Sequence, residues 1–150
     1  MSVYTDSNFA DKADDSRSVS GVAVTLGNAT VSWINSTQNI VTLSTTEAEY
    51  VALGDGNLAS FIVVSDLAEK VIEVFVDNEG AINLASNPLS SARMKHVDVR
   101  FHFVRELVSS GRLSSNKYVS TNEQRADIMT KPLVGYIFKE NRNFLMNLHL

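Results

Sequence analysis

Cysteine is absent from the 150-residue sequence, which excludes disulfides and thiolate metal sites and suits a reducing, intracellular compartment. There is also no apolar run of membrane length, no N-terminal signal pattern, no internal repeat and no low-complexity tract. Histidine occurs only three times. Oxygen-bearing side chains are therefore the main candidates for binding a metal ion.

Charge is unevenly distributed along the chain. Residues 1–90 hold 3 Lys/Arg against 12 Asp/Glu, and residues 91–150 hold 10 against 5, so the two parts carry −9 and +5 of the net −4. An acidic part that binds metal and a basic part that binds phosphate would account for this asymmetry, as would an uneven solvated surface. The length and the 44% hydrophobic content predict a single domain over residues 1–150, and the early start of the first strand is compatible with a piece of a longer protein.

The order of local patterns predicts an α/β domain that begins with antiparallel strands. Alternating apolar residues in 22–26 and 29–34 flank Gly27-Asn28, a two-residue hairpin signal. A continuous apolar run, 71–78, is typical of a strand buried on both faces. Further strands are expected at 2–6 and 117–121, and helices at 46–70, 80–86, 92–111, 122–132 and 138–150.

The stretch STTEAEY, residues 44–50, has two interpretations. Ser44 and Glu47 fit the capping box that begins many helices, which is a purely structural role. At 100° per residue, Glu47 shares a face with Val51 and Phe61, whereas Glu49 points elsewhere. We therefore expect Glu47 to lie at the top of the buried face, and Glu49 to face solvent or to support the site from behind.

Four carboxylates occupy informative positions: Asp6 ends the first strand, Glu47 begins the first helix, Asp77 ends the buried strand, and Asp127 lies early in a short helix. Each has an ordinary explanation as a turn residue or a first-turn acid. Together they would form an oxygen-only site for Mg²⁺, with Mn²⁺ as a substitute. Two such ions catalyse in-line phosphodiester hydrolysis.

Several segments occur in the order of one known family. They are YTDSNFA (4–10), DSRSVSG (15–21), VSWINSTQNIVTLSTTEAEYVAL (31–53), VDNEGAINLASNP (76–88), ARMKHVDVRFHFVREL (92–107) and YVSTNEQRADIMTKPL (118–133). In these segments the chain resembles the RNase H domain of copia-type LTR retrotransposon Pol polyproteins. The resemblance implies an RNase H-like fold, with a five-stranded mixed sheet whose first three strands are antiparallel, flanked by helices.

The same resemblance implies a function and roles for residues. Asp6, Glu47, Asp77 and Asp127 match the metal-binding acids, and two Mg²⁺ ions would support cleavage of the RNA strand in RNA–DNA hybrids during reverse transcription. The partners would be the hybrid and the reverse transcriptase portion of the same polyprotein, in a cytoplasmic particle with no membrane. Candidates for substrate contacts are Ser7, Asn78, Arg93, Lys95, His96, Arg100 and Arg105, and His96 or His102 is a candidate for assisting product release.

Two departures from the family keep alternatives open. Residues 54–71 follow the family pattern poorly, and Ser120 stands where proline is usual. One alternative is a repurposed module that binds nucleic acid or a protein without catalysis. Another is a domain that acts only with the rest of a reverse transcriptase.

Overall fold

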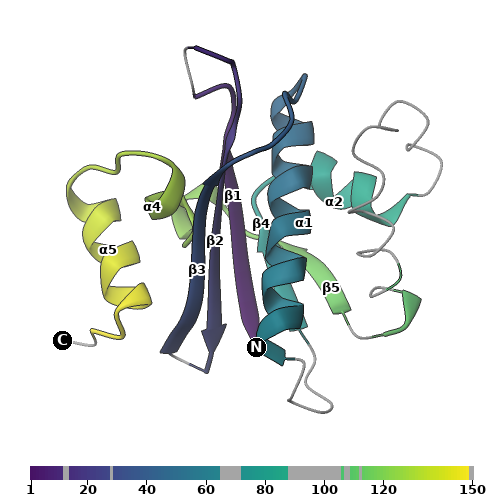
Figure 1. Ribbon diagram of the computed structural model, residues 1–150. Coiled ribbons are helices and arrows are strands. Elements are labelled where there is room, and N and C mark those ends of the chain that lie inside the picture. The colour runs from purple at the N-terminus through teal and green to yellow at the C-terminus, as the bar shows by residue number, and fades with distance from the viewer. Residues whose placement is uncertain are drawn as a thin grey trace.

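The computed structural model describes residues 1–11, 14–27, 29–64, 72–87, 106, 109–111 and 113–148. Its centre is a five-stranded sheet in the order β3-β2-β1-β4-β5 (Figure 1). The strands are β1 (Ser2–Asn8), β2 (Val19–Leu26), β3 (Ala29–Thr37), β4 (Ile72–Val76) and β5 (Leu113–Tyr118). The pairs β1–β2 and β2–β3 are antiparallel, and β4 is parallel to both β1 and β5, which confirms the expected mixed sheet.

The first two connections follow from local chemistry. Gly27 has φ +62°, the conformation that the hairpin turn between β2 and β3 needs and that glycine adopts without steric cost. The central strands β1, β2 and β4 supply the buried core residues Val3, Val22, Val24, Val74 and Val76. The prediction of the hairpin is confirmed. The apolar run does form a strand, β4, but the expectation that both of its faces are buried is wrong: Ile72, Val74 and Val76 are buried, whereas Glu73 and Phe75 on the other face are half-buried. β5 begins and ends earlier than the predicted strand 117–121. Its sequence LSSNKY is polar and has no apolar alternation, so the sequence pattern did not reveal its bounds.

One face of the sheet is covered by the helix α1 (Thr45–Val64), with α2 (Glu79–Ser86) beside it. Gly56 allows this close packing, since a Cβ there would lie 2.3 Å from Cγ2 of Thr5. The helix continues through Gly54 and Gly56 without a break, and the rest of the predicted span 46–70 lies outside the described residues. No helix among the described residues is long and apolar enough to cross a membrane.

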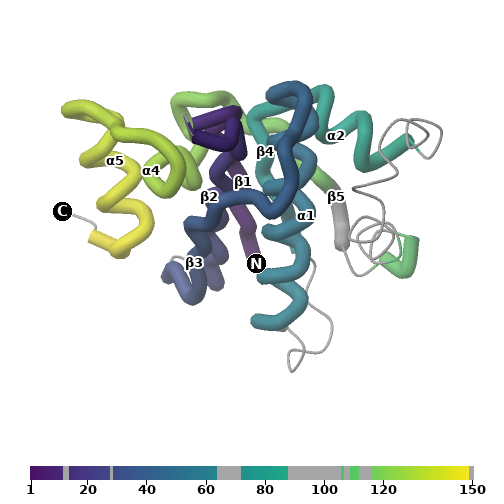
Figure 2. Tube along the Cα trace, turned by 45° about the horizontal axis from the view of Figure 1, so that its top comes forward, coloured from purple at the N-terminus to yellow at the C-terminus, as the bar shows by residue number. Residues whose placement is uncertain are grey.

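The other face is covered by α4 (Asp127–Thr130) and α5 (Gly135–Leu145), as both views show (Figures 1 and 2). A short 3₁₀ turn, η2 (Thr121–Glu123), precedes α4, so the predicted helix 122–132 is in fact two short pieces. From α5, Phe144 meets Tyr4 of β1 edge to face at 5.5 Å between ring centroids. The predicted helix 92–111 lies mostly outside the described residues.

Candidate metal centre

Three aspartates meet at one edge of the sheet. β1 and β4 are parallel, and their register pairs Thr5 with Val76, so Asp6 and Asp77 follow side by side at the carboxyl ends of the two strands. Asp127 reaches the same place as the first residue of α4. One carboxylate oxygen from each of the three lies within 4.8 Å of the others. The geometry thus brings together three of the four acids expected from the sequence.

Successive residues of β1 serve opposite faces of the sheet at this edge. Thr5 faces α1, as its closeness to Gly56 shows, and Ser7 faces the same helix through its bonds to Glu49. Asp6, between them, lies toward α4, where Thr130 contacts it. Groups from both helical layers therefore converge on three consecutive positions of one strand.

Close packing against β2 places α4. Gly21 is the β2 partner of Asp6, and a Cβ there would lie 2.6 Å from Cγ2 of Thr130 and 2.9 Å from Cβ of Met129. Asn8 donates from Nδ2 to the carbonyl of Thr130 at 3.2 Å, and Asn35 donates to that of Met129. These two carbonyls end the helix and have no partner within it, so strand side chains fix the end of α4.

Gln124 links β1 to the start of α4 through its buried amide. Its Nε2 donates to the carbonyl of Thr5 at 2.9 Å, and its Oε1 accepts from the backbone N–H of Ala126 at 3.2 Å. Thr5 and Ala126 each precede one of the aspartates, Asp6 and Asp127. The amide therefore sets the spacing between these two ligands.

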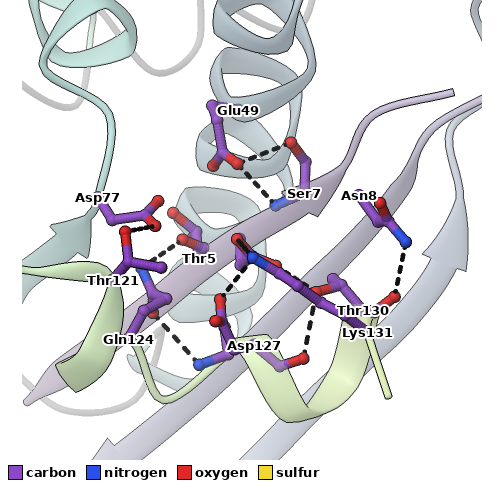
Figure 3. A network of polar contacts seen from close by, with 12 residues as sticks. Thr5, Ser7, Asn8, Glu49, Asp77, Thr121, Gln124, Asp127, Thr130 and Lys131 are labelled. Atoms are coloured by element: carbon purple, nitrogen blue, oxygen red, sulfur yellow. Dashed lines mark hydrogen bonds and ion pairs between the residues drawn. The ribbon is translucent and has the colours of Figure 1, made fainter. Parts of the chain in front are cut away.

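Glu49 is the glutamate that faces the aspartates, so the expectation for the two glutamates is wrong. Glu49 is 7% exposed, and its Oε1 accepts from the backbone N–H of Ser7 at 3.0 Å and from its hydroxyl at 2.8 Å (Figure 3). Glu47 is half-buried, and its Oε2 accepts from the backbone N–H of Leu43 at 2.7 Å, while its own N–H donates to Oγ of Ser44 at 3.2 Å. Glu47 therefore stabilises the start of α1: Ser44 caps its N–H, and its carboxylate binds the residue before Ser44.

The error arose because the buried face of α1 was inferred from its apolar residues. Residues 48–53 are all buried, so the helix is enclosed around its whole circumference at this level. Leu58 and Ile62, which at 100° per residue fall on the same face as Glu47, are 45% and 67% exposed. An apolar stripe therefore cannot identify the inner face of α1 near Glu49, because the helix is buried on every side at that level.

The carboxylates are held by hydrogen bonds and one ion-paired lysine. Oδ2 of Asp6 accepts from the hydroxyl of Thr130, and Oδ2 of Asp77 accepts from that of Thr121 at 3.0 Å. Nζ of Lys131 lies 3.3 Å from Oδ1 of Asp6 and 3.0 Å from Oδ1 of Asp127. Figure 3 shows Lys131 reaching back over α4 into the site.

Burial and mutual repulsion shift the acids toward their neutral forms. Burial, together with the charge of Asp127, raises the pKa of Asp6 to about 7. Burial, together with the charges of Asp6 and Asp77, raises the pKa of Glu49 to about 8. Burial also raises the pKa of Asp127, against the opposing effect of Lys131. A bound cation would offset both the burial and the repulsion of the carboxylates, because it brings positive charge and coordinates their oxygens.

The donor set fits a hard divalent cation. All candidate ligands are carboxylate oxygens, as Mg²⁺ and Mn²⁺ prefer. Oε2 of Glu49 is buried and has no hydrogen-bond partner, and a buried carboxylate oxygen of this kind is costly unless something binds it. Asp6, Asp77, Asp127 and Glu49 are therefore the residues that could hold the metal.

Of the remaining candidates from the sequence, the structure describes only Ser7 and Asn78. Ser7 orients Glu49, and Oδ1 of Asn78 caps α2 by accepting from the N–H of Ala81 at 3.0 Å. These hydrogen bonds give both residues a structural role that does not require a substrate. The predicted phosphate-contacting and histidine candidates lie outside the described residues: Arg93, Lys95, His96, Arg100, His102 and Arg105.

The sequence reasoning missed Glu49, Thr130, Lys131 and Gln124 as site residues. For Lys131 a signal was present, because Asp127 and Lys131 stand four apart, the spacing of a helical ion pair. For Gln124, a polar residue between charged neighbours, the sequence pattern resembles that of an ordinary exposed turn.

Comparison with known proteins finds relatives among transposon polyproteins. The chain is 39% identical, over 85% of its length, to the retrovirus-related Pol polyprotein from transposon TNT 1-94 of Nicotiana tabacum. It is 37% identical, over 93% of its length, to that from transposon RE2 of Arabidopsis thaliana. The chain spans about 10% of the length of these curated relatives. No protein-family model matches it.

Solved structures with a similar fold are RNases H. LC11-RNase H1, crystallised with an RNA/DNA hybrid, superimposes with a TM-score of 0.66 at 16% identity, over 86% of this chain and 92% of that one. RNase H1 from the halophilic archaeon Halobacterium salinarum gives a TM-score of 0.56 at 18% identity, over 86% of this chain and 92% of that one.

Proposed function

The chain is homologous to a segment of the retrovirus-related Pol polyproteins of plant transposons and has the RNase H fold, and from this premise we propose that it is a metal-dependent endonuclease. Its proposed substrate is the RNA strand of an RNA–DNA hybrid, and its proposed context is reverse transcription of a retrotransposon. The observation that carries the proposal is the convergence of Asp6, Asp77 and Asp127 within 4.8 Å. Glu49 supplies a fourth acid beside them.

The proposed chemistry needs divalent cations, Mg²⁺ by preference and Mn²⁺ as a substitute. Two such ions, when bound, activate the attacking water and stabilise the leaving oxygen of the phosphodiester. Four carboxylates offset the charge of the ions, and the acids that the described residues supply favour hard cations over Zn²⁺.

The protein's own side chains hold the carboxylates in fixed orientations. Thr130 and Thr121 hold one oxygen each of Asp6 and Asp77, which leaves the other oxygens directed at the site. Ser7 holds Glu49 through two donors to one oxygen, so its second oxygen faces the cluster. Rotational freedom of three ligands is thus removed before any ion binds, which reduces the entropy that binding must overcome.

The experiment is cleavage of 5′-labelled RNA in an RNA–DNA duplex, with Mg²⁺, Mn²⁺ or EDTA. The variant Asp77→Asn is the companion, because Asp77 is only half-buried and its amide can still accept from Thr121. We expect cleavage that requires metal, leaves 3′-hydroxyl and 5′-phosphate ends, and is lost in the variant.

A folded protein that cuts the hybrid with neither metal would contradict the proposal. Binding of the uncut hybrid in EDTA, weakened by salt, would then favour a non-catalytic nucleic-acid module. Activity that returns only when the reverse transcriptase portion is added would instead show that this domain depends on its polyprotein.

A further inference from the structure

Lys131 lies where a cation would bind two of the three aspartates. It follows α4 directly, and its ammonium is 3.3 Å from Oδ1 of Asp6 and 3.0 Å from Oδ1 of Asp127. Neither oxygen has another hydrogen-bond partner, although both are buried. Among the residues that the structure describes, no other basic side chain pairs with these aspartates.

The ammonium and a divalent cation would use the same oxygens. Two buried carboxylates so close repel each other strongly, and a single positive charge between them relieves much of the repulsion. A divalent ion bound to these oxygens would in turn repel an ammonium in the same place. The two cations are therefore alternatives at this position.

We propose that Lys131 is an internal counter-cation: it holds the carboxylates together in the metal-free protein and must withdraw when a divalent ion binds. Lys131 thereby lowers the affinity of the site for metal and protects the fold when metal is absent. This inference rests on the proposed metal site and adds a competitor to it.

The geometry of Lys131 permits the withdrawal. Its backbone is extended, at φ −136° and ψ 149°, and ends α4, so the side chain can rotate without disturbing helical hydrogen bonds. The side chain is 32% exposed, and an aliphatic stem of this kind can carry its charged head to solvent. Burial by itself would lower the pKa of Lys131, but the attraction of Asp6 and Asp127 outweighs it, so the ammonium stays charged.

The test compares wild type with Lys131→Met, which keeps the stem and removes the charge. Lys139→Met, a substitution of an exposed lysine in α5, changes the net charge equally and serves as the control. Mn²⁺ affinity is measured by isothermal titration calorimetry, and Tm is measured in EDTA and in saturating Mn²⁺. We expect Lys131→Met to bind Mn²⁺ about tenfold more tightly, while Lys139→Met binds as wild type does.

The thermal measurement should change sign with metal. In EDTA, Lys131→Met should melt several degrees below wild type, because the aspartates lose their counter-charge. In saturating Mn²⁺ it should melt at or above wild type, a reversal that a general packing defect would not produce. Lys131→Gln is the second variant, with a shorter neutral side chain, should the methionine variant fold poorly.

The outcomes separate the inference from the metal site itself. Unchanged or weaker Mn²⁺ binding in Lys131→Met, with wild type binding normally, would overturn the role of Lys131 alone. Absence of Mn²⁺ binding by the folded wild type would overturn both this role and the proposed metal centre.

Discussion

The two glutamates of the STTEAEY stretch make a matched pair of variants, Glu49→Gln and Glu47→Gln. They stand two residues apart and undergo the same change, yet the structure assigns them different surroundings. Glu49 is buried beside the aspartates, whereas Glu47 caps α1 through Leu43. Glutamine also satisfies a capping box, so Glu47→Gln should leave the helix intact.

Cleavage is the first measurement. Loss of one metal-binding carboxylate should reduce hybrid cleavage by Glu49→Gln by about 100-fold or more, which corresponds to roughly 2.7 kcal/mol or more in the transition state. Glu47→Gln should retain activity to within about twofold, since its side chain makes no contact in the site.

Stability of the metal-free protein gives an independent measure. The pKa of Glu49 rises from 4.5 to about 8 on folding. A raised carboxyl pKa leaves its stability contribution intact below the unfolded pKa and removes it as pH rises through the folded pKa. Linkage therefore gives a loss of about 3 kcal/mol between pH 5 and pH 8 from this group alone. Glu49→Gln should lack this loss.

The assay is urea denaturation in EDTA at pH 5 and pH 8. The difference in unfolding free energy between Glu49→Gln and wild type should move in favour of the variant by about 3 kcal/mol over this range. The cost of burying an amide instead of a carboxyl is the same at both pH values, so it cancels when the free-energy difference at pH 5 is subtracted from that at pH 8. Equal pH dependence in the two proteins, or an inactive Glu47→Gln beside an active Glu49→Gln, would refute the assignment.

Three further predictions follow from the same site. Gly21→Ala should destabilise the protein by about 1–3 kcal/mol and reduce cleavage, because a Cβ 2.6 Å from Cγ2 of Thr130 would push α4 away from β2; a Tm equal to that of wild type would contradict this packing. Gln124→Ala should cost about 3 kcal/mol, since it leaves a cavity and frees the carbonyl of Thr5 and the N–H of Ala126, and Mn²⁺ titration should show weakened binding as the aspartates lose their spacing. Removal of metal by EDTA should lower Tm more at pH 8 than at pH 5. The reason is that the pKa values of Asp6 and Glu49 are raised, so the metal-free site becomes repulsive only once both carboxyls ionise. An equal loss of Tm at both pH values would contradict this prediction.

Local signals predicted the parts of this fold that depend on local chemistry. Gly27 between two alternating runs specified the hairpin, and the run at 71–78 specified a strand that delivers Asp77 to the sheet edge, although only one face of that strand is buried. Asp6 was identified as the acid that ends the predicted strand 2–6, although β1 continues beyond it to Asn8. For such positions the alternation of side chains along a strand determines both place and direction.

Features that depend on tertiary contacts could not be predicted. The phase of α1 was wrong because residues 48–53 are buried all round, and only the position of Ser7 shows which glutamate faces the site. The polar strand β5 gave no apolar pattern, and α4 is only four residues long, too short for periodicity. The ion pair of Lys131 with Asp6 joins residues 125 positions apart, which no local pattern reports.

The position of β1 in the centre of the sheet has a consequence for the timing of activity. β1 precedes β4 and α4 in the chain, so Asp6 gains Asp77 only after β4 is in place, and gains Thr130 and Asp127 only after α4 has docked on β2. On a ribosome, which delivers the chain from its N-terminus, this edge of the sheet is completed by nearly the last segment of the domain. A chain truncated before α4 would accordingly carry Asp6 without the groups that complete the candidate metal site.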